Sequence, residues 1–203
     1  MASIVFTAGA MVGATLVVLL VATMWHRPLR IWPTPGDGTW QSYVFWPLFR
    51  GLNALCCASA TADILLARPP GIGLPTWLRI SAGVGLVMAV ALFVYAFRML
   101  GRDNSYGAQD GLVTTGIYQW SRNPQNAMLI VVYGCLAVAA ATPQTALLCA
   151  AMIAVYTLMV FAEEPWLRAS YGATYQRYCH DVPRFFNWRL ALARARAMVI
   201  GPR

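Results

Sequence analysis

Long runs of apolar residues without charge alternate with short polar segments along the chain. An α-helix rises about 1.5 Å per residue, so roughly 20 residues cross a bilayer core of about 30 Å. Runs of about this length predict membrane-spanning helices over Ile4–Met24, Tyr43–Ala67, Ile80–Phe97 and the two arms of Pro124–Ala162. The pattern therefore predicts an all-α, polytopic membrane protein with about five transmembrane helices.

The last two predicted helices form a C-terminal helical hairpin. Residues 123–162 carry no charged side chain, and Pro143 supplies a turn signal near their middle. A stretch of about 40 residues is just long enough to cross a bilayer twice. The chain then enters after Arg122 and returns at Glu163 and Glu164 on the same side. The hairpin thus predicts that an arginine and two carboxylates meet at one polar surface.

Two charged residues interrupt the second predicted helix, Arg50 and Asp63. A charge inside a membrane helix is costly and usually faces a polar cavity or another helix. Asp63 is therefore either a functional carboxylate or a solvated residue near the helix end. The sequence leaves open whether the two side chains meet.

The segments between the predicted helices are rich in Pro, Gly and Trp. Ile31–Trp46 contains several indoles, which are typical of the headgroup region, with cofactor stacking as the alternative. Gly101–Ser121 is a polar loop, and Trp188–Ile200 predicts a basic amphipathic helix at the membrane interface.

The net charge of +8 comes from 15 basic residues, all of them arginine. Most lie in the loops and tail that the predicted topology places on one side, whereas Arg68 and Arg79 lie in the outer loop. The positive-inside rule and attraction to anionic lipids explain this distribution, so we expect a bilayer and no nucleic acid as partner. The rule predicts a cytoplasmic C-terminus, and the exclusive use of arginine indicates a GC-rich bacterial source and an inner membrane. The five cysteines show no metal-ligand spacing, so no metal and no disulfide are expected.

A set of motifs occupies the C-terminal half in a fixed order. It comprises Gly111-Leu112-Val113-Thr114-Thr115-Gly116-Ile117-Tyr118, Ser121-Arg122-Asn123-Pro124, Glu163-Glu164, Tyr171-Gly172, Tyr175, Tyr178 and Val182-Pro183-Arg184-Phe185. This order and spacing resemble the integral-membrane methyltransferases of the isoprenylcysteine carboxyl methyltransferase and phospholipid methyltransferase superfamily. The resemblance covers residues 80–186 and implies a helical membrane enzyme that uses S-adenosylmethionine.

Two positions depart from the family pattern. Asn123 stands where the family commonly has His, and Gln125 stands where the family often has Tyr. Asn keeps hydrogen-bonding capacity but loses the titration and stacking of an imidazole. The departure puts in doubt any cofactor contact that the family makes through the His ring.

A site for S-adenosylmethionine needs acceptors for its ammonium and ribose, a partner for its carboxylate and aromatic faces for its sulfonium and adenine. We expect Glu163 and Glu164 to bind the ammonium or ribose and Arg122 to hold a carboxylate of the cofactor or the acceptor. Arg122 and Glu164 are the predicted catalytic residues. The full set of predicted cofactor-binding residues is Gly116, Tyr118, Arg122, Asn123, Pro124, Glu163, Glu164, Tyr175 and Tyr178.

We interpret the chain as a single domain, with N-terminal spans over 1–79, a cofactor-binding core over 80–186 and a basic interfacial tail over 187–203. The predicted activity is methyl transfer to a lipid-soluble or amphiphilic acceptor at a cytoplasmic pocket. The acceptor is either an isoprenylcysteine-like carboxylate or a phospholipid amine. One alternative is an NAD(P)H-dependent reductase of sterol or steroid type, for which Asp63 is the intramembrane acid. The other is a non-catalytic membrane scaffold.

Overall fold

The computed structural model describes residues 2–66, 71–101 and 111–186, and the regular elements in these ranges are all helices. The long helices are α1 (Ala2–Trp25), α2 (Trp40–Leu65), α3 (Thr76–Leu100), α5 (Pro124–Ala140) and α6 (Pro143–Asp181). The short 3₁₀ helices are η1 (Arg27–Leu29) and η2 (Gly116–Gln119). The predicted all-α class is confirmed.

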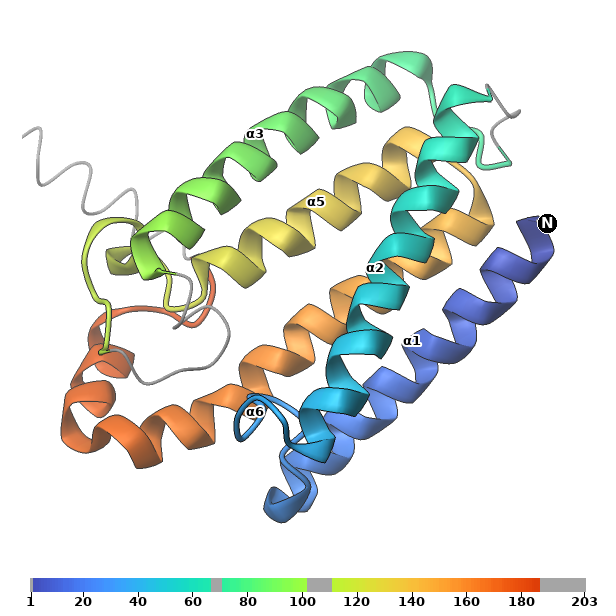
Figure 1. Ribbon diagram of the computed structural model, residues 1–203. Coiled ribbons are helices and arrows are strands. Elements are labelled where there is room, and N and C mark those ends of the chain that lie inside the picture. Colours follow the sequence, from blue (N-terminus) through green and yellow to red (C-terminus); the bar gives the residue numbers. More distant parts are fainter. Residues whose placement is uncertain (1, 67–70, 102–110, 187–203) are drawn as a thin grey trace, which may run out of the picture.

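The long helices pack into a bundle around α6 (Figure 1). Helix α6 contacts α1 on one side and α5 on the other, α3 packs on α5, and α2 packs mainly on α1. The largest group of buried apolar side chains comes mainly from α1, α2 and α6, with Ile31 and Trp32 from the connection between α1 and α2 and Tyr133 from α5. The first two helices thus form one side of the bundle, and α3 with α5 forms the other.

Three of these helices, α1 from Ile4 onwards, α3 and α6, are long and apolar enough to cross a membrane. Helix α5 is apolar but has only 17 residues, and α2 does not reach the same level of hydropathy. The prediction of a helical membrane protein is confirmed, and the five predicted spans correspond to five long helices among the described residues.

The predicted C-terminal hairpin is present, with its turn at the expected place. Helix α5 ends at Ala140, Ala141 takes a left-handed conformation with φ 54°, and α6 begins at Pro143. Proline fits the first position of a helix because its missing N–H needs no partner there. Both arms of the hairpin begin in this way, at Pro124 and at Pro143.

Helix α6 continues well beyond the predicted end of the hairpin at Ala162. It runs through Pro165 to Asp181 and bends at Gly172, where φ is 52° and ψ is −129°. Glycine reaches this region readily because it has no Cβ. Residues 143–162 carry no charge and already suffice to cross a bilayer, so Glu163 and the residues after it lie outside the spanning segment.

Arg50 and Asp63 do not meet in the structure, which answers the question that the sequence left open. Asp63 is buried, and its Oδ2 accepts hydrogen bonds from the hydroxyls of Thr142 at 2.5 Å and Thr145 at 2.7 Å. The Arg50 guanidinium lies 5.2 Å from the ring centre of Trp46.

Several predictions fall on residues that the structure does not describe. These are the tail helix over Trp188–Ile200, positions 102–110 of the polar loop, and positions 67–70 after α2.

Candidate functional site

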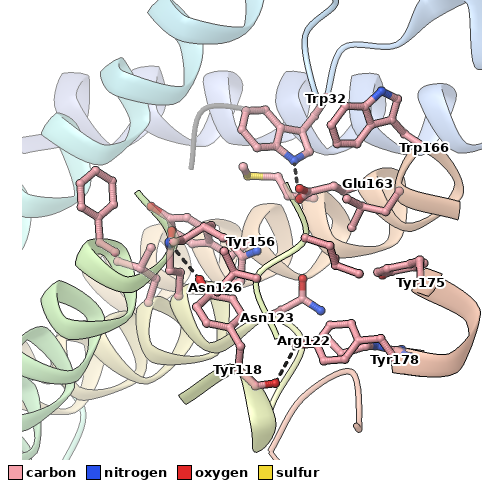
Figure 2. Close-up of a pocket in the computed structure, with 18 of the residues that line it drawn as sticks. Trp32, Tyr118, Arg122, Asn123, Asn126, Tyr156, Glu163, Trp166, Tyr175 and Tyr178 are labelled. Atoms are coloured by element: carbon pink, nitrogen blue, oxygen red, sulfur yellow. Dashed lines mark hydrogen bonds between the residues drawn. The ribbon is translucent and has the colours of Figure 1, made fainter. Parts of the chain in front are cut away.

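A cavity of about 230 Å³ lies where α6 leaves its apolar segment (Figure 2). Its wall includes aromatic side chains of α2 and α3, namely Trp46, Phe49, Phe93 and Phe97. It also includes polar side chains, among them Arg122 and Glu163. Among the described lining residues these two are the only charged side chains, and they have opposite signs.

Glu163 lines the cavity and accepts a hydrogen bond at its Oε2 from the indole Nε1 of Trp32, at 3.3 Å. Burial raises the pKa of Glu163 to about 7; the Trp32 hydrogen bond opposes this rise, and the neighbouring Glu164 charge adds to it. The carboxyl group therefore exchanges its proton near neutral pH, where a general acid or base works best.

Glu164 lies in the opposite environment, although it is the next residue. Its side chain is only 6% exposed, and Arg184 binds it in a bidentate manner, with Nε at 2.7 Å and Nη2 at 2.8 Å. Arg122 Nη2 lies 2.9 Å from the same carboxylate, and Arg168 Nη2 lies 3.6 Å away. Burial alone would raise the pKa of Glu164, but the Arg184 hydrogen bonds and the three arginine charges lower it below the ordinary value. Glu164 thus stays ionised and anchors arginines.

Arg122 connects this anchor to the cavity. Its Nη1 donates to the carbonyl of Cys179 at 3.1 Å, and its backbone N–H donates to the carbonyl of Pro183 at 2.9 Å. Its Nε is buried and has no hydrogen-bond partner in the described part of the chain. A buried donor without a partner is rare and costly, so this atom is suited to meet an oxygen of a ligand.

Further hydrogen bonds join the segment before α5 to the segment after α6. The Tyr178 hydroxyl donates to the carbonyl of Tyr118 at 2.6 Å. The Asn123 side-chain amide donates to the carbonyl of Arg184 at 3.0 Å, and the Ser121 hydroxyl donates to the same oxygen at 3.4 Å. The two motif groups that lie far apart in the sequence are therefore one structural unit.

Gly116 sets the turn that leads into η2. Its φ is +60°, and a Cβ there would lie 2.6 Å from Cε of Met99, so a larger residue meets both strain and a close contact. The turn places Tyr118, whose hydroxyl accepts a hydrogen bond from Gln125 Nε2 at 3.1 Å. Gln125 thus holds Tyr118 from the position where the family often has Tyr.

The structure brings most of the predicted site residues to the cavity wall. Those that line it are Tyr118, Arg122, Asn123, Glu163, Tyr175 and Tyr178. Gly116, Pro124 and Glu164 do not line it; they shape the turn, start α5 and hold the arginines, respectively. The roles predicted for all nine residues stay predictions, and the geometry assigns Glu164 to arginine anchoring.

Sequence reasoning missed the contribution of the N-terminal half. Trp32, Trp46 and Phe49 line the cavity, and Asn126 adds an amide from α5. The cluster of indoles between α1 and α2 was the available signal, but the headgroup region explains such indoles equally well.

The fold and the cavity define a helical membrane protein with a polar site at the end of its C-terminal hairpin. Residues 78–174 match the sequence model of the phospholipid methyltransferase family. The match confirms the resemblance that the motifs predicted, and it includes Arg122 and both glutamates. It supports a membrane methyltransferase. No curated protein and no solved structure gives a significant match to the chain.

Proposed function

We propose that the protein is an S-adenosylmethionine-dependent methyltransferase whose acceptor is a lipid-soluble or amphiphilic molecule. The observation that carries this proposal is a cavity whose wall combines two oppositely charged side chains, Arg122 and Glu163, with many aromatic rings. The family match of residues 78–174 supplies the reaction class.

The described residues fit the proposed cofactor. Arg122 offers a buried Nε without a partner, which suits a carboxylate. Glu163 supplies the negative charge that a cationic ligand requires, and the aromatic rings of Trp166 and Tyr175 in the cavity wall suit a sulfonium or an adenine. Glu164 would hold Arg122 in place from behind.

The cofactor, when bound, supplies an electrophilic methyl group. The residues of this chain would bind the two reactants in one cavity. Holding reactants in line accounts for much of the rate enhancement in such displacements. The Tyr178–Tyr118 and Arg184–Glu164 contacts would help to hold the segments around Arg122 in place.

The aromatic side chains that α2 and α3 contribute to the cavity wall suit the apolar part of an amphiphilic acceptor. These two helices lie on opposite sides of the bundle (Figure 1). An amphiphile could place its apolar chain between Phe49 and Phe93 while its polar group reaches Arg122. We also propose that the site faces the cytoplasm, as the arginine distribution predicts. The exclusive use of arginine supports a bacterial inner membrane.

The position of Asp63 speaks against the reductase alternative. Asp63 binds the hydroxyl of Thr142 at the start of α6, about 20 residues and roughly 30 Å along the helix from Glu163. Among the described residues no second carboxylate lines the cavity.

Calorimetric titration of the detergent-purified protein with S-adenosylhomocysteine, with NADPH in parallel, tests the proposal. We expect the wild type to bind the first ligand only. Arg122→Gln should weaken binding at least tenfold, because hydrogen bonds to charged groups contribute about 1.5–3 kcal/mol.

Arg168→Gln is the matched control, because Arg168 also pairs with Glu164, at 3.6 Å, but is exposed and does not line the cavity. It should weaken binding much less than Arg122→Gln does. Binding of NADPH alone would favour the reductase, and binding of neither ligand would favour a scaffold.

A further inference from the structure

Helix α6 changes direction at Gly172, and the residues after this bend form a C-terminal arm, defined here as residues 173–186. Gly172 has φ 52° and ψ −129°, a conformation that residues with a Cβ rarely adopt. A Cβ at this position would find open space, so neighbouring side chains do not fix the bend. After the bend the chain turns back towards the segment before α5 (Figure 1). The bend thus has the properties of a hinge.

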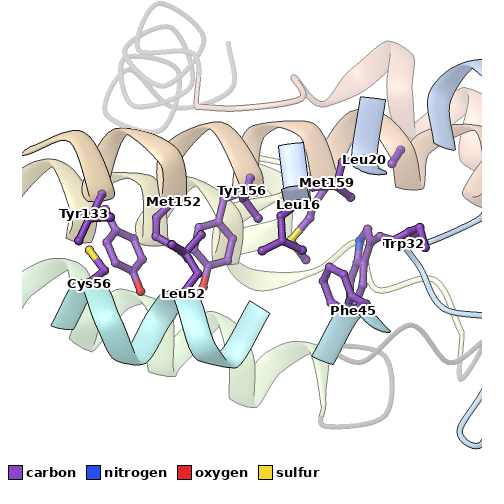
Figure 3. Packing of buried hydrophobic residues seen from close by; sticks show 14 of the residues in the cluster. Leu16, Leu20, Trp32, Phe45, Leu52, Cys56, Tyr133, Met152, Tyr156 and Met159 are labelled. Atoms are coloured by element: carbon purple, nitrogen blue, oxygen red, sulfur yellow. The ribbon is translucent and has the colours of Figure 1, made fainter. Parts of the chain in front are cut away.

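The C-terminal arm has a small apolar cluster of its own. Three of its side chains are buried there, namely Tyr175, Tyr178 and Val182. They pack against Leu112 from the segment before α5 and Leu167 from the part of α6 before the bend. This cluster is separate from the main apolar cluster of the bundle, part of which Figure 3 shows. A segment with few apolar contacts to the main core is among those that open most readily.

The arm covers polar groups of the cavity wall. Tyr175 and Tyr178 line the cavity and are only 1% and 8% exposed. The carbonyl of Cys179 accepts the hydrogen bond from Arg122 Nη1 at 3.1 Å. Arg122 Nε, which we propose meets a ligand carboxylate, is buried in this arrangement. A charged ligand reaches a buried atom from the aqueous side when part of the wall moves, and the arm is a part that has a hinge.

An ion pair joins the arm to the part of α6 before the bend. Arg184 Nε and Nη2 bind the Glu164 carboxylate at 2.7 and 2.8 Å, and the Arg184 guanidinium lies 4.4 Å from the ring centre of Phe161. The Arg184 side chain is 35% exposed, so water reaches this pair. Arg168 also pairs with Glu164, at 3.6 Å, but both residues precede Gly172. The Arg184 pair therefore crosses the hinge, whereas the Arg168 pair does not.

We propose that the C-terminal arm is a hinged cover of the cavity, that it turns about Gly172, and that the Arg184–Glu164 pair is the latch that sets how often it opens. The inference adds to the proposed function a route by which a charged, water-soluble ligand enters and leaves. It rests on the proposed function for the identity of that ligand.

The position of the latch predicts its kinetic effect. Neither Arg184 nor Glu164 lines the cavity, so the same pair forms whether or not a ligand is bound. Breaking it favours the open arm in both states by a similar factor. Entry and release of the ligand then become faster together, and the equilibrium affinity changes little. A residue that supports only the liganded state would instead change release and affinity.

Stopped-flow measurement of S-adenosylhomocysteine binding to the full-length protein in detergent tests the latch. The indoles of Trp32, Trp46 and Trp166 in the cavity wall supply the fluorescence signal. Arg184→Gln should raise the association and dissociation rate constants by about fivefold or more and leave the affinity within about threefold of wild type. Arg168→Gln is the matched control, because Arg168 pairs with the same carboxylate from before the bend. It should leave both rate constants within about twofold.

Hydrogen–deuterium exchange tests the hinge without a ligand. Exchange over residues 173–186 should be about fivefold faster in Arg184→Gln than in wild type, and exchange over residues 143–162 should be unchanged. Gly172→Ala should give the same pattern, because alanine strains the closed bend. Gly134→Ala is its control, because Gly134 lies within α5 and a Cβ there also finds open space.

A rise in the dissociation rate constant alone, with an equal loss of affinity, would overturn the inference. Unchanged exchange over residues 173–186, or equal effects of Arg168→Gln and Arg184→Gln, would also overturn it. If the wild type does not bind S-adenosylhomocysteine, the proposed function fails, and the exchange data alone decide whether the arm is a hinged cover. If Arg184→Gln does not fold, the comparison of Gly172→Ala with Gly134→Ala decides.

Discussion

An acidic side chain lies near each end of the apolar segment of α6, namely Asp63 of α2 at its start and Glu163 of α6 at its other end. The two regions differ in the groups that surround the carboxylate. At the start, Asp63 accepts hydrogen bonds from Thr142 and Thr145, and Thr145 is also hydrogen-bonded to Ser59 at 2.7 Å. At the other end, Glu163 lines a cavity and receives one hydrogen bond from an indole.

The difference separates an acidic residue that joins two helices from an acidic residue that lines the cavity. Both residues carry the same signal in the sequence, a carboxylate beside a long apolar run. The hydroxyls at Asp63 come from the helix that it packs against, so they join α2 to α6. Glu163 lines the cavity, and the neighbouring arginines Arg122 and Arg184 bind Glu164 instead.

The largest effect is expected from Glu164→Ala. The substitution leaves Arg122 buried without its carboxylate, and breaking a buried ion pair in this way costs about 3–5 kcal/mol. The free energy of unfolding in detergent should fall by about 3 kcal/mol, and ligand binding should fall with it. Glu163→Gln should leave the free energy of unfolding nearly unchanged. Equal losses in the two variants would contradict the division of roles between them.

The stability that Glu164 contributes should depend on pH. Because the folded protein lowers its pKa, this stability is present above the pKa of the unfolded chain and disappears as the pH falls through the lower, folded value. Acid unfolding of Glu164→Gln should therefore lack the part of the pH dependence that the wild type owes to this group. Circular dichroism between pH 7 and pH 2 measures the difference.

Asp63→Asn should affect stability alone. An amide can still accept one hydroxyl hydrogen bond but loses the charge, so we expect a loss of about 1–2 kcal/mol. Titration with S-adenosylhomocysteine should give the wild-type affinity. A folded Asp63→Asn protein without ligand binding would show that the two regions act together.

Tyr178→Phe should have a smaller effect on ligand binding. It keeps the ring and removes the hydroxyl that donates to the Tyr118 carbonyl, a contact that contributes about 1 kcal/mol. Ligand affinity should fall a few fold. Tyr171→Phe is the matched control, because Tyr171 lines the same cavity and its hydroxyl makes no hydrogen bond among the described residues. A larger effect in the control would contradict the role of the Tyr178 hydroxyl.

The lengths of the hydrophobic runs in the sequence predicted which residues meet at the end of the hairpin. The charge-free residues 123–162 placed Arg122 beside the paired glutamates, and the structure finds it 2.9 Å from Glu164. Which glutamate faces the cavity was not predictable. Successive helix residues point about 100° apart, so their directions must differ, but the choice depends on the rotation of α6 against its neighbours.

The contribution of Trp32 was beyond the reach of sequence patterns for a related reason. Its contact with Glu163 joins residues 131 positions apart. It depends on the path of the connection between α1 and α2, where neither helical nor strand periodicity applies. Helix α6 also continues through Pro165, although proline inside a helix usually kinks or breaks it. This continuation places Tyr175 and Tyr178 on the cavity wall.

The smallest effect is expected at Asn123, the position that departs from the family pattern. Its amide donates to the Arg184 carbonyl, and a histidine ring N–H can make the same type of hydrogen bond. Asn123→His should therefore keep the free energy of unfolding within about 0.5 kcal/mol and ligand affinity within about twofold, whereas Asn123→Ala should lose about 1 kcal/mol of stability. If the histidine variant binds S-adenosylhomocysteine at least tenfold more tightly, the ring makes a ligand contact that asparagine lacks. If it binds equally well, this position serves to join the loop before α5 to the end of α6, and the departure from the family pattern leaves the site complete.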